Sequence, residues 1–269
     1  MKVRITDDFD LDKIDESGQC FRVKRYEDDE YRFIFRDKIL HIKKVNDNEY
    51  YVNSSREEWK SVWEPYFDMS RNYSEIRELI DKDDDYLKAA SCDGKGIRIL
   101  KQDPFEMLLT FIISQRKNIP AIKKSVELIC QKFGERAEDE DEEVFLFPDP
   151  LKMRDITVDD LKGLSLGYRD EYIVDAVRMV NSGELLPDEL YTLSDEDLFE
   201  ALKRVKGVGN KVSNCICLFA YGRTGMVPVD TWIAKVIKEV YNGVDPFFKY
   251  GDNAGIMQQW IFYHARKAE

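Results

Sequence analysis

The sequence predicts an α+β protein, with an antiparallel β-sheet in the N-terminal part and helices in the rest of the chain. Segments 31–36 and 39–43 are rich in β-branched and aromatic residues, and the two residues between them suit a tight hairpin. From Asp103 onward, apolar residues recur at helical spacing instead. This change of period predicts an α+β domain at 1–100 and an all-helical region at 101–269.

Within the first domain, the hairpin connection is expected at Asp37–Lys38. A further strand is expected at 49–52, which would complete a small twisted sheet. Two helices, at 56–67 and 73–81, are expected to follow it.

The helical region opens with a clear start signal. Asp103 is a good N-cap, Pro104 suits the first helical position, and Glu106 stands at the third. The nearly continuous apolar run from Met107 to Ile113 predicts a helix that is buried on most sides. Further helices are expected at 119–133, 158–163, 169–181, 196–204, 210–221, 230–241 and 254–266.

The composition excludes several classes of protein. With 43% hydrophobic and 35% charged residues, the chain is typical of a globular protein, and no apolar run approaches the roughly 20 residues of a membrane span. The N-terminus has no apolar signal-peptide core, so a cytoplasmic monomer is expected. Five scattered cysteines argue against a disulfide framework, and two histidines argue against a serine-hydrolase triad. No catalytic metal or redox cofactor is expected.

The net charge of −12 argues against a nucleic-acid partner, because contact with phosphates usually requires a basic face. The acid is unevenly distributed, however. An unbroken acidic run at 138–143 and a nearly unbroken one at 81–85 are typical of solvated loops, whereas several lysines lie in helical segments. The charge therefore disfavours DNA binding without excluding it.

The most informative segment is 202–212, where a helix is expected to end, a Gly207-Val208-Gly209 hairpin to turn, and a second helix to begin at once. The free N–H groups at the start of that second helix can bind a phosphate oxygen without side-chain charge. An ordinary helix corner with a glycine cap explains these glycines about equally well.

The sequence around the hairpin carries a family resemblance. Lys211 follows the hairpin directly, and Val227-Pro228-Val229-Asp230 follows the second helix. Three other segments match motifs of the same family in the same order: Ser17-Gly18-Gln19-Cys20-Phe21-Arg22, Gln102-Asp103-Pro104-Phe105-Glu106 and Leu166-Gly167-Tyr168-Arg169. Together they resemble the 8-oxoguanine DNA glycosylase/AP lyases of the helix-hairpin-helix (HhH-GPD) superfamily. The resemblance covers nearly the whole chain, and the family fold of a twisted antiparallel sheet beside helical domains agrees with the elements expected above.

The resemblance implies a bifunctional enzyme that extrudes 8-oxoguanine from duplex DNA. Lys211 would attack C1′ of the deoxyribose and form a Schiff base, and β-elimination would then nick the strand. Without the flanking motif, Lys211 would be interpreted as a solvated or phosphate-binding lysine. Asp230 would stabilise the positive charge that develops on the sugar. Its alternative role, an N-cap, is compatible with that one.

The resemblance also implies a pocket for the extruded base. Cys215 and Phe262 would stack on its two faces, and Gln258 would read its Watson–Crick edge. Gln258 and Phe262 are four residues apart on the last expected helix, so both can face one pocket. Gly18 would offer its carbonyl to N7–H, a donor that guanine lacks. The simpler interpretation of the helix pair is a core aromatic residue beside a surface glutamine.

The residues expected to contact DNA lie in three segments, and Tyr168 among them resembles the wedge that props open the base stack. They are Arg116, Lys117, Asn118, Tyr168, Arg169, Gly207 and Gly209.

Three positions depart from the better-known animal enzymes. Arg116 stands where an asparagine fills the space left by the extruded base, and Ala121 stands where an arginine reads the orphaned cytosine. Trp232 replaces a histidine that commonly follows the catalytic aspartate. The chemistry is therefore expected to be intact and the recognition of the opposite strand altered.

Two alternatives stay open. The chain could be an HhH glycosylase for alkylated purines or formamidopyrimidines, although Lys211 argues against a monofunctional alkyl-base enzyme. It could also be a non-catalytic DNA-binding module that uses the hairpin only for phosphate contact. For the 8-oxoguanine glycosylase, the resemblance also implies that carbonyls of Lys203, Val205 and Val208 could hold a monovalent cation at the hairpin, as in relatives.

Overall fold

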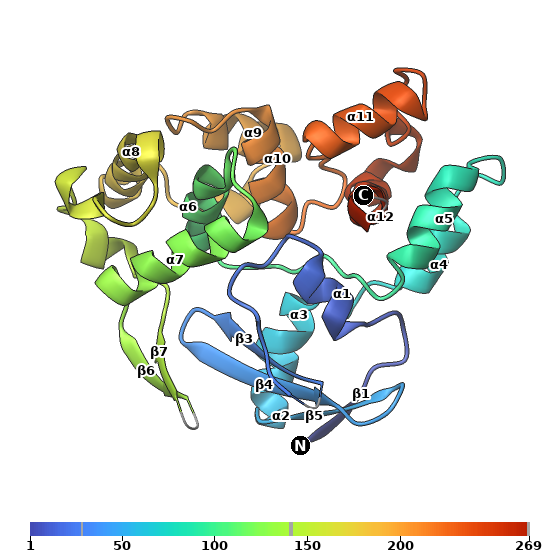
Figure 1. Ribbon diagram of the computed structural model, residues 1–269, viewed down its shortest axis with the longest axis horizontal. Helices are drawn as coiled ribbons and strands as arrows, with labels where there is room; N and C mark the ends of the chain where they lie inside the picture. The colour runs from blue at the N-terminus through green and yellow to red at the C-terminus, as the bar shows by residue number, and fades with distance from the viewer. Residues whose placement is uncertain (28, 140–141, 268–269) are drawn as a thin grey trace. The chain divides into compact units, whose positions relative to one another are not determined.

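The computed structural model describes residues 1–27, 29–139 and 142–267 (Figure 1). It confirms the α+β class, with an N-terminal five-stranded antiparallel sheet followed by a helical region. The strand order is β1-β5-β4-β3-β2. The strands are β1 (Lys2–Arg4), β2 (Lys24–Arg25), β3 (Glu30–Phe35), β4 (Lys38–Lys44) and β5 (Glu49–Val52).

The central hairpin turns one residue earlier than predicted. β3 ends at Phe35 and β4 begins at Lys38, so the connection is Arg36–Asp37. Arg36 adopts a left-handed φ of 54°, and its guanidinium donates to the carboxylates of Asp103 and Asp188 at 2.8 Å each. These ion pairs hold Arg36 in the turn, and no local sequence pattern could have indicated them.

The helices and helical turns are, in chain order, α1 (Leu11–Glu16), α2 (Arg56–Glu58), the π-helical turn η1 (Trp59–Trp63), α3 (Glu64–Tyr66), α4 (Tyr73–Glu78), α5 (Asp85–Asp93), α6 (Pro104–Ser114), α7 (Ile119–Phe133), η2 (Pro150–Met153), η3 (Asp159–Leu161), η4 (Gly167–Arg169), α8 (Asp170–Asn181), η5 (Glu189–Thr192), α9 (Asp195–Lys203), α10 (Asn210–Phe219), α11 (Thr231–Glu239), η6 (Phe248–Asn253) and α12 (Ala254–Lys267). Most of the expected helices are confirmed. The helix predicted at 158–163 is wrong, because only a single 3₁₀ turn forms there before Gly163 takes a φ of 85°.

The interpretation of the acidic runs as loops is confirmed at 81–84 and is wrong for the described residues of 138–143. In the first, Asp84 caps α5 by accepting the Leu87 N–H at 2.9 Å, and Asp85 lies in the first turn, where the helix dipole favours negative charge. The second run lies in a two-stranded hairpin of β6 (Arg136–Asp139) and β7 (Glu142–Phe145), with residues 140–141 outside the described part of the chain. Its pairing is supported by the buried Val144.

The described residues form two compact units that differ from the linear division at 100/101. Unit 1 comprises 1–32, 40–101 and 222–269, and unit 2 comprises 33–39 and 102–221. The C-terminal segment belongs to unit 1 because α12 packs along α5. Gly94 directly follows α5, and a Cβ there would lie 2.5 Å from Cδ1 of Trp260 on α12. The contact between the two helices therefore depends on glycine.

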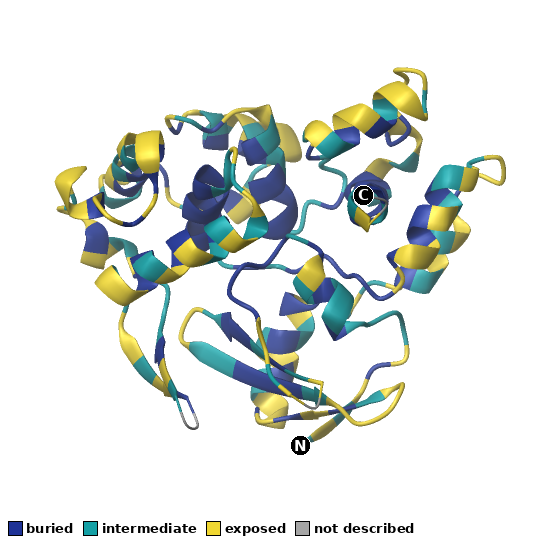
Figure 2. Cartoon of the chain, viewed as in Figure 1, coloured by how far each residue is buried: buried dark blue, intermediate teal, exposed yellow. Residues whose placement is uncertain are grey.

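In unit 2 the core forms around α6. Asp103 accepts the N–H groups of Phe105 and Glu106 at 3.0 Å, and every residue from Pro104 to Ile113 is buried, as the start signal and apolar run predicted. Helices α7, α8 and α10 pack on it. Figure 2 shows α6 and α10 mostly in the buried colour. No helix in the described residues is long and apolar enough to span a membrane.

Candidate active site

The hairpin between α9 and α10 in unit 2 has the geometry expected of segment 202–212. Gly207 has a φ of 85°, and a Cβ there would lie 2.3 Å from the ring of Tyr172 on α8. Gly209 is the N-cap of α10 and provides no side-chain hydrogen bond to the first turn. Those N–H groups thus keep their positive end open to an anion.

Lys211 is the second residue of α10 and is half-buried. Its Nζ lies 5.5 Å from the ring centroid of Phe111, which stacks on Phe219 at 5.6 Å. Among the described residues, no carboxylate pairs with its ammonium group. The Lys211 ammonium therefore lies beside an aromatic ring and has no carboxylate counter-ion among the described residues.

Cys215 lies one turn further along α10 and is 3% exposed. Because residues at i and i+4 share a helix face, Cys215 and Lys211 lie on the same face of α10.

Asp230 belongs to unit 1 and is the N-cap of α11. Its Oδ1 accepts the Ile233 N–H at 2.9 Å, so the capping role holds. The side chain is half-buried and oriented by that bond. Burial lowers the pKa of Arg266 on α12, while the carboxylates of Glu16 and Asp230 oppose this.

Gly18, also in unit 1, is presented by a rigid turn with a φ of 75°. The fully buried Gln19 fixes this turn: its Nε2 donates to Ser17 Oγ and to the Arg98 carbonyl at 2.9 Å, and its Oε1 accepts the Leu100 N–H at 2.8 Å. The Ser17 and Gln19 positions of the motif are structural, and they leave Gly18 with a defined orientation.

A hydrogen bond links helix α12 to this turn, because Gln259 Nε2 donates to the Ser17 carbonyl at 2.6 Å. On the same helix, Phe262 is half-buried, whereas Gln258 is 3% exposed rather than a surface residue. The Oε1 atom of Gln258 is buried without a hydrogen-bond partner. A buried unsatisfied acceptor costs stability, so this amide is a candidate for ligand recognition.

The three residues expected to contact DNA near the start of α7 differ in their surroundings. Arg116 is exposed and has a left-handed φ of 52°. Lys117 turns inward, with Nζ donating to Ser125 Oγ at 2.7 Å and to the Ser165 carbonyl. Burial lowers the pKa of Lys117, and the nearby Arg169 lowers it further. Asn118 caps α7 by accepting the Ala121 N–H at 3.0 Å.

The turn before α8 carries Tyr168, the residue expected to act as a wedge. Tyr168 is 52% exposed, and its ring contacts Tyr172 edge-on at 5.8 Å between centroids. Arg169 is buried, with Nη1 donating to the Leu166 carbonyl at 2.8 Å and Nη2 to the Gln115 carbonyl. The DNA contacts of these residues stay predictions, and the structure adds that both charged side chains, Lys117 and Arg169, already bind backbone carbonyls.

Two residues that sequence reasoning missed hold the hairpin. Gln115 Nε2 donates to the Gly207 carbonyl at 3.2 Å, and Tyr172 underlies Gly207. Only an aromatic residue four positions after Tyr168 hinted at the second contact. The hairpin cation also stays a prediction, since one of its proposed carbonyls, that of Val205, already accepts the Val208 N–H at 3.0 Å.

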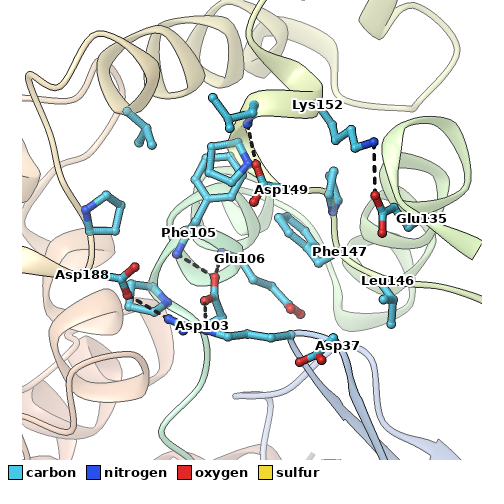
Figure 3. A pocket seen from close by; sticks show the side chains of 17 residues that line it. Asp37, Asp103, Phe105, Glu106, Glu135, Leu146, Phe147, Asp149, Lys152 and Asp188 are labelled. Carbon is cyan, nitrogen blue, oxygen red and sulfur yellow. Dashed lines mark hydrogen bonds and ion pairs between the residues drawn. The ribbon is translucent and has the colours of Figure 1, made fainter. Parts of the chain in front are cut away.

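A cavity of about 670 Å³ opens at the N-terminal end of α6 (Figure 3). Phe105 and Phe147 contribute to its walls, and Asp103 and the Glu135–Lys152 ion pair lie on its border. None of the predicted site residues lines it. It is therefore separate from the chemistry expected of Lys211.

Comparison with known proteins identifies the family. Residues 2–108 match the N-terminal domain of 8-oxoguanine DNA glycosylases, and residues 109–245 match the HhH-GPD superfamily of base excision DNA repair proteins. The chain belongs to the HhH-GPD superfamily. This confirms the family resemblance of the motifs.

Individual relatives agree with this. The chain is 34% identical over 164 residues to the N-glycosylase/DNA lyase of Saccharomyces cerevisiae, covering 56% of this chain and 44% of that protein. It is 26% identical to a probable N-glycosylase/DNA lyase of Methanothermobacter thermautotrophicus, covering 79% and 75%. The 8-oxoguanine glycosylase/lyase of Clostridium acetobutylicum, solved with DNA containing cytosine opposite 8-oxoguanine, is 37% identical, with a TM-score of 0.93 and coverage of 99% and 95%. The chain thus spans less than half of the yeast relative's length.

Proposed function

We propose that this HhH-GPD protein is an 8-oxoguanine DNA glycosylase with AP-lyase activity, acting as a monomer on duplex DNA. The observation that carries the proposal is the place of Lys211, directly after a phosphate-binding type of hairpin and without a carboxylate partner among the described residues. The fold-wide similarity to a glycosylase/lyase supports the same chemistry.

In the proposed reaction, the bond between C1′ and the damaged base breaks and its electron pair leaves with the base. The lone pair of the Lys211 nitrogen forms a bond to C1′, and a proton of that nitrogen passes to the departing base. The C1′–O4′ bond then breaks, O4′ takes up a proton, and the nitrogen and C1′ form a Schiff base. Loss of a C2′ proton then expels the 3′ phosphate and nicks the strand. The negative charge of Asp230 stabilises the cationic sugar in the first step.

Four residues are proposed to recognise the extruded base. The unpartnered Gln258 Oε1 would accept an N–H from the Watson–Crick edge of a guanine-type base. The rigid Gly18 carbonyl would accept N7–H of 8-oxoguanine, which distinguishes the lesion from guanine. Cys215 and Phe262 would contact the faces of the ring.

Borohydride trapping tests the covalent step. The wild-type protein incubated with duplex 8-oxoguanine DNA should give a covalent adduct, and Lys211→Gln should give none while still binding the lesion. The control is Lys206→Gln, because Lys206 is an exposed hairpin lysine paired with Glu171 at 2.7 Å. Adduct formation by Lys211→Gln at the wild-type level would reject the assignment, and no adduct with wild-type protein would favour a non-catalytic DNA-binding module.

Excision from a panel of lesions tests the substrate. We expect faster release of 8-oxoguanine than of alkylated purines or formamidopyrimidines. Faster release of an alkylated purine would replace the proposed substrate with that of the alternative glycosylase.

A further inference from the structure

Two segments of unit 2 are joined by a reciprocal pair of hydrogen bonds. Lys117, in the segment before α7, donates to the carbonyl of Ser165 in the turn before α8. Arg169, in that turn, donates to the carbonyl of Gln115 in the first segment. Each segment thus supplies one cation and one carbonyl. We refer to segments 115–117 and 165–169 with these two bonds as the clasp.

Both halves of the clasp contain left-handed backbone at residues other than glycine. Arg116 has a φ of 52°, and Ser165 has a φ of 60°. Such conformations are unfavourable for side-chain-bearing residues and persist only when their surroundings impose them. The bonded carbonyl belongs to Ser165 itself in one segment and to the residue before Arg116 in the other. The cations therefore bind where the backbone needs support.

The clasp also reaches the exposed aromatic ring of Tyr168. The guanidinium carbon of Arg169 lies 4.4 Å from the centroid of that ring, within the range of a cation–π contact. The Tyr168 ring also contacts Tyr172, whose ring packs against Gly207 of the hairpin. Gln115, in the first segment of the clasp, also donates a hydrogen bond to the Gly207 carbonyl and so links the clasp to the hairpin.

We propose that Lys117 is a positioning residue that holds Tyr168 and Arg116 ready to enter the base stack, rather than a ligand of DNA phosphates. Its ammonium is directed at two protein oxygens, those of Ser125 and Ser165. This inference rests on the proposed function, since it assigns Lys117 to the extrusion step. It revises the expectation that Lys117 contacts DNA directly.

The test separates extrusion from chemistry. Lys117→Met removes the ammonium and keeps the apolar stem. Single-turnover excision is measured on 8-oxoguanine paired with cytosine and on 8-oxoguanine opposite an abasic site, where less pairing energy must be overcome. Because extrusion costs a few kcal/mol in a paired duplex, we expect a loss on the order of tenfold on the paired substrate and a much smaller loss on the unpaired one.

Two variants serve as controls. Lys124→Met removes an exposed lysine from α7, the helix that follows Lys117, and its ratio between the two substrates should equal that of the wild type. Ser125→Ala removes one of the two acceptors of Lys117 from a fully buried position, and it should shift the ratio in the same direction by less.

Salt dependence identifies the alternative role. Removing a phosphate ligand lowers the slope of log affinity against log salt by about one. Lys117→Met should leave that slope unchanged. A reduced slope with equal losses on both substrates would overturn the proposal, as would equal losses accompanied only by a lower melting temperature.

Hydrogen exchange of the free protein provides a readout that needs no activity. Lys117→Met should speed amide exchange in both 115–118 and 165–169, whereas unchanged exchange would overturn the clasp. If the wild type did not excise 8-oxoguanine from either substrate, the proposed function would be wrong. The role of Lys117 in extrusion would then also be wrong, even if hydrogen exchange showed that the clasp exists.

Discussion

At the scale of single residues, two residues proposed for the site and a neighbour of a third have a structural task. Asp230 caps α11, Asn118 caps α7, and Gln19 fixes the turn that presents Gly18. A carboxylate that caps a helix is also held in one orientation, so the same bond that stabilises the fold preorganises the charge. Experiments must therefore separate loss of stability from loss of chemistry.

Asp230→Asn makes that separation. Asparagine caps helices about as well as aspartate, so we expect a stability change within about 0.5 kcal/mol. Removing the charge should slow base excision by roughly 10²- to 10³-fold, the range seen when one electrostatic group of an active site is lost. Single-turnover excision and thermal unfolding measure the two effects. A variant that unfolds readily yet excises at the wild-type rate while folded would show a structural residue only.

Recognition of the base opposite the lesion also depends on single residues. Ala121 lies in the first turn of α7 and has no side-chain donor, where relatives use an arginine. A good bidentate contact is worth about 1–3 kcal/mol of discrimination, and its loss should compress the preference for cytosine toward the low end of that range. Excision of 8-oxoguanine opposite each of the four bases measures this.

A cytosine preference of about a hundredfold or more would contradict the expectation. The exposed Arg116 would then be the first side chain to replace, with Arg116→Ala, because Lys117 is engaged inside the protein.

At the scale of elements, the hairpin shows why its two glycines differ. Gly207 has a positive φ and lies against Tyr172, whereas Gly209 has ordinary dihedral angles and open space where a Cβ would be. The first is required by the fold. A Cβ on the second would have no atom of the described residues within 4 Å apart from its chain neighbours, which fits a backbone that must approach another molecule.

Gly207→Ala and Gly209→Ala should therefore have opposite signatures. Gly207→Ala should lower the free energy of unfolding by at least about 1–2 kcal/mol, the usual cost of a left-handed alanine, with the clash against Tyr172 added. Gly209→Ala should change the stability little and weaken binding to duplex DNA. Urea unfolding and DNA titrations compare the pair. Equal stability losses would show that the open space at Gly209 has no functional meaning.

At the scale of the whole molecule, the sheet-bearing unit is assembled from both ends of the chain. All five strands of the larger sheet lie within residues 2–52, of which 33–39 belong to unit 2, yet α12 packs on α5 and Gln259 bonds to the turn at Ser17. The helices that carry Gln258 and Asp230 thus belong to the unit that carries Gly18. Unit 1 is therefore discontinuous in sequence.

This organisation predicts how fragments behave. A fragment of residues 1–101 should lack cooperative unfolding, because the face of α5 that covers α12 would be exposed. Joining 222–269 to it through a flexible linker should restore a cooperative transition in urea, followed by far-UV circular dichroism. Cooperative unfolding of 1–101 alone would favour the linear division at residue 100 over the discontinuous unit.

The sequence by itself determined the elements whose causes are local. Asp103-Pro104 starts α6 and the glycines turn the hairpin, because caps, proline and left-handed backbone act within a few residues. The ordered motifs from Ser17 to Phe262 were also sufficient to indicate the family.

Only the tertiary structure decided features that depend on partners far along the chain. Arg36 is held in the sheet hairpin by Asp103 and Asp188. Gln258 is buried, with its Oε1 atom lacking a hydrogen-bond partner, rather than lying at the surface. Lys117, which the sequence assigned to DNA, binds Ser125 and the Ser165 carbonyl. Charged side chains are long and can satisfy several partners, so their role is set by which oxygen lies within reach after folding.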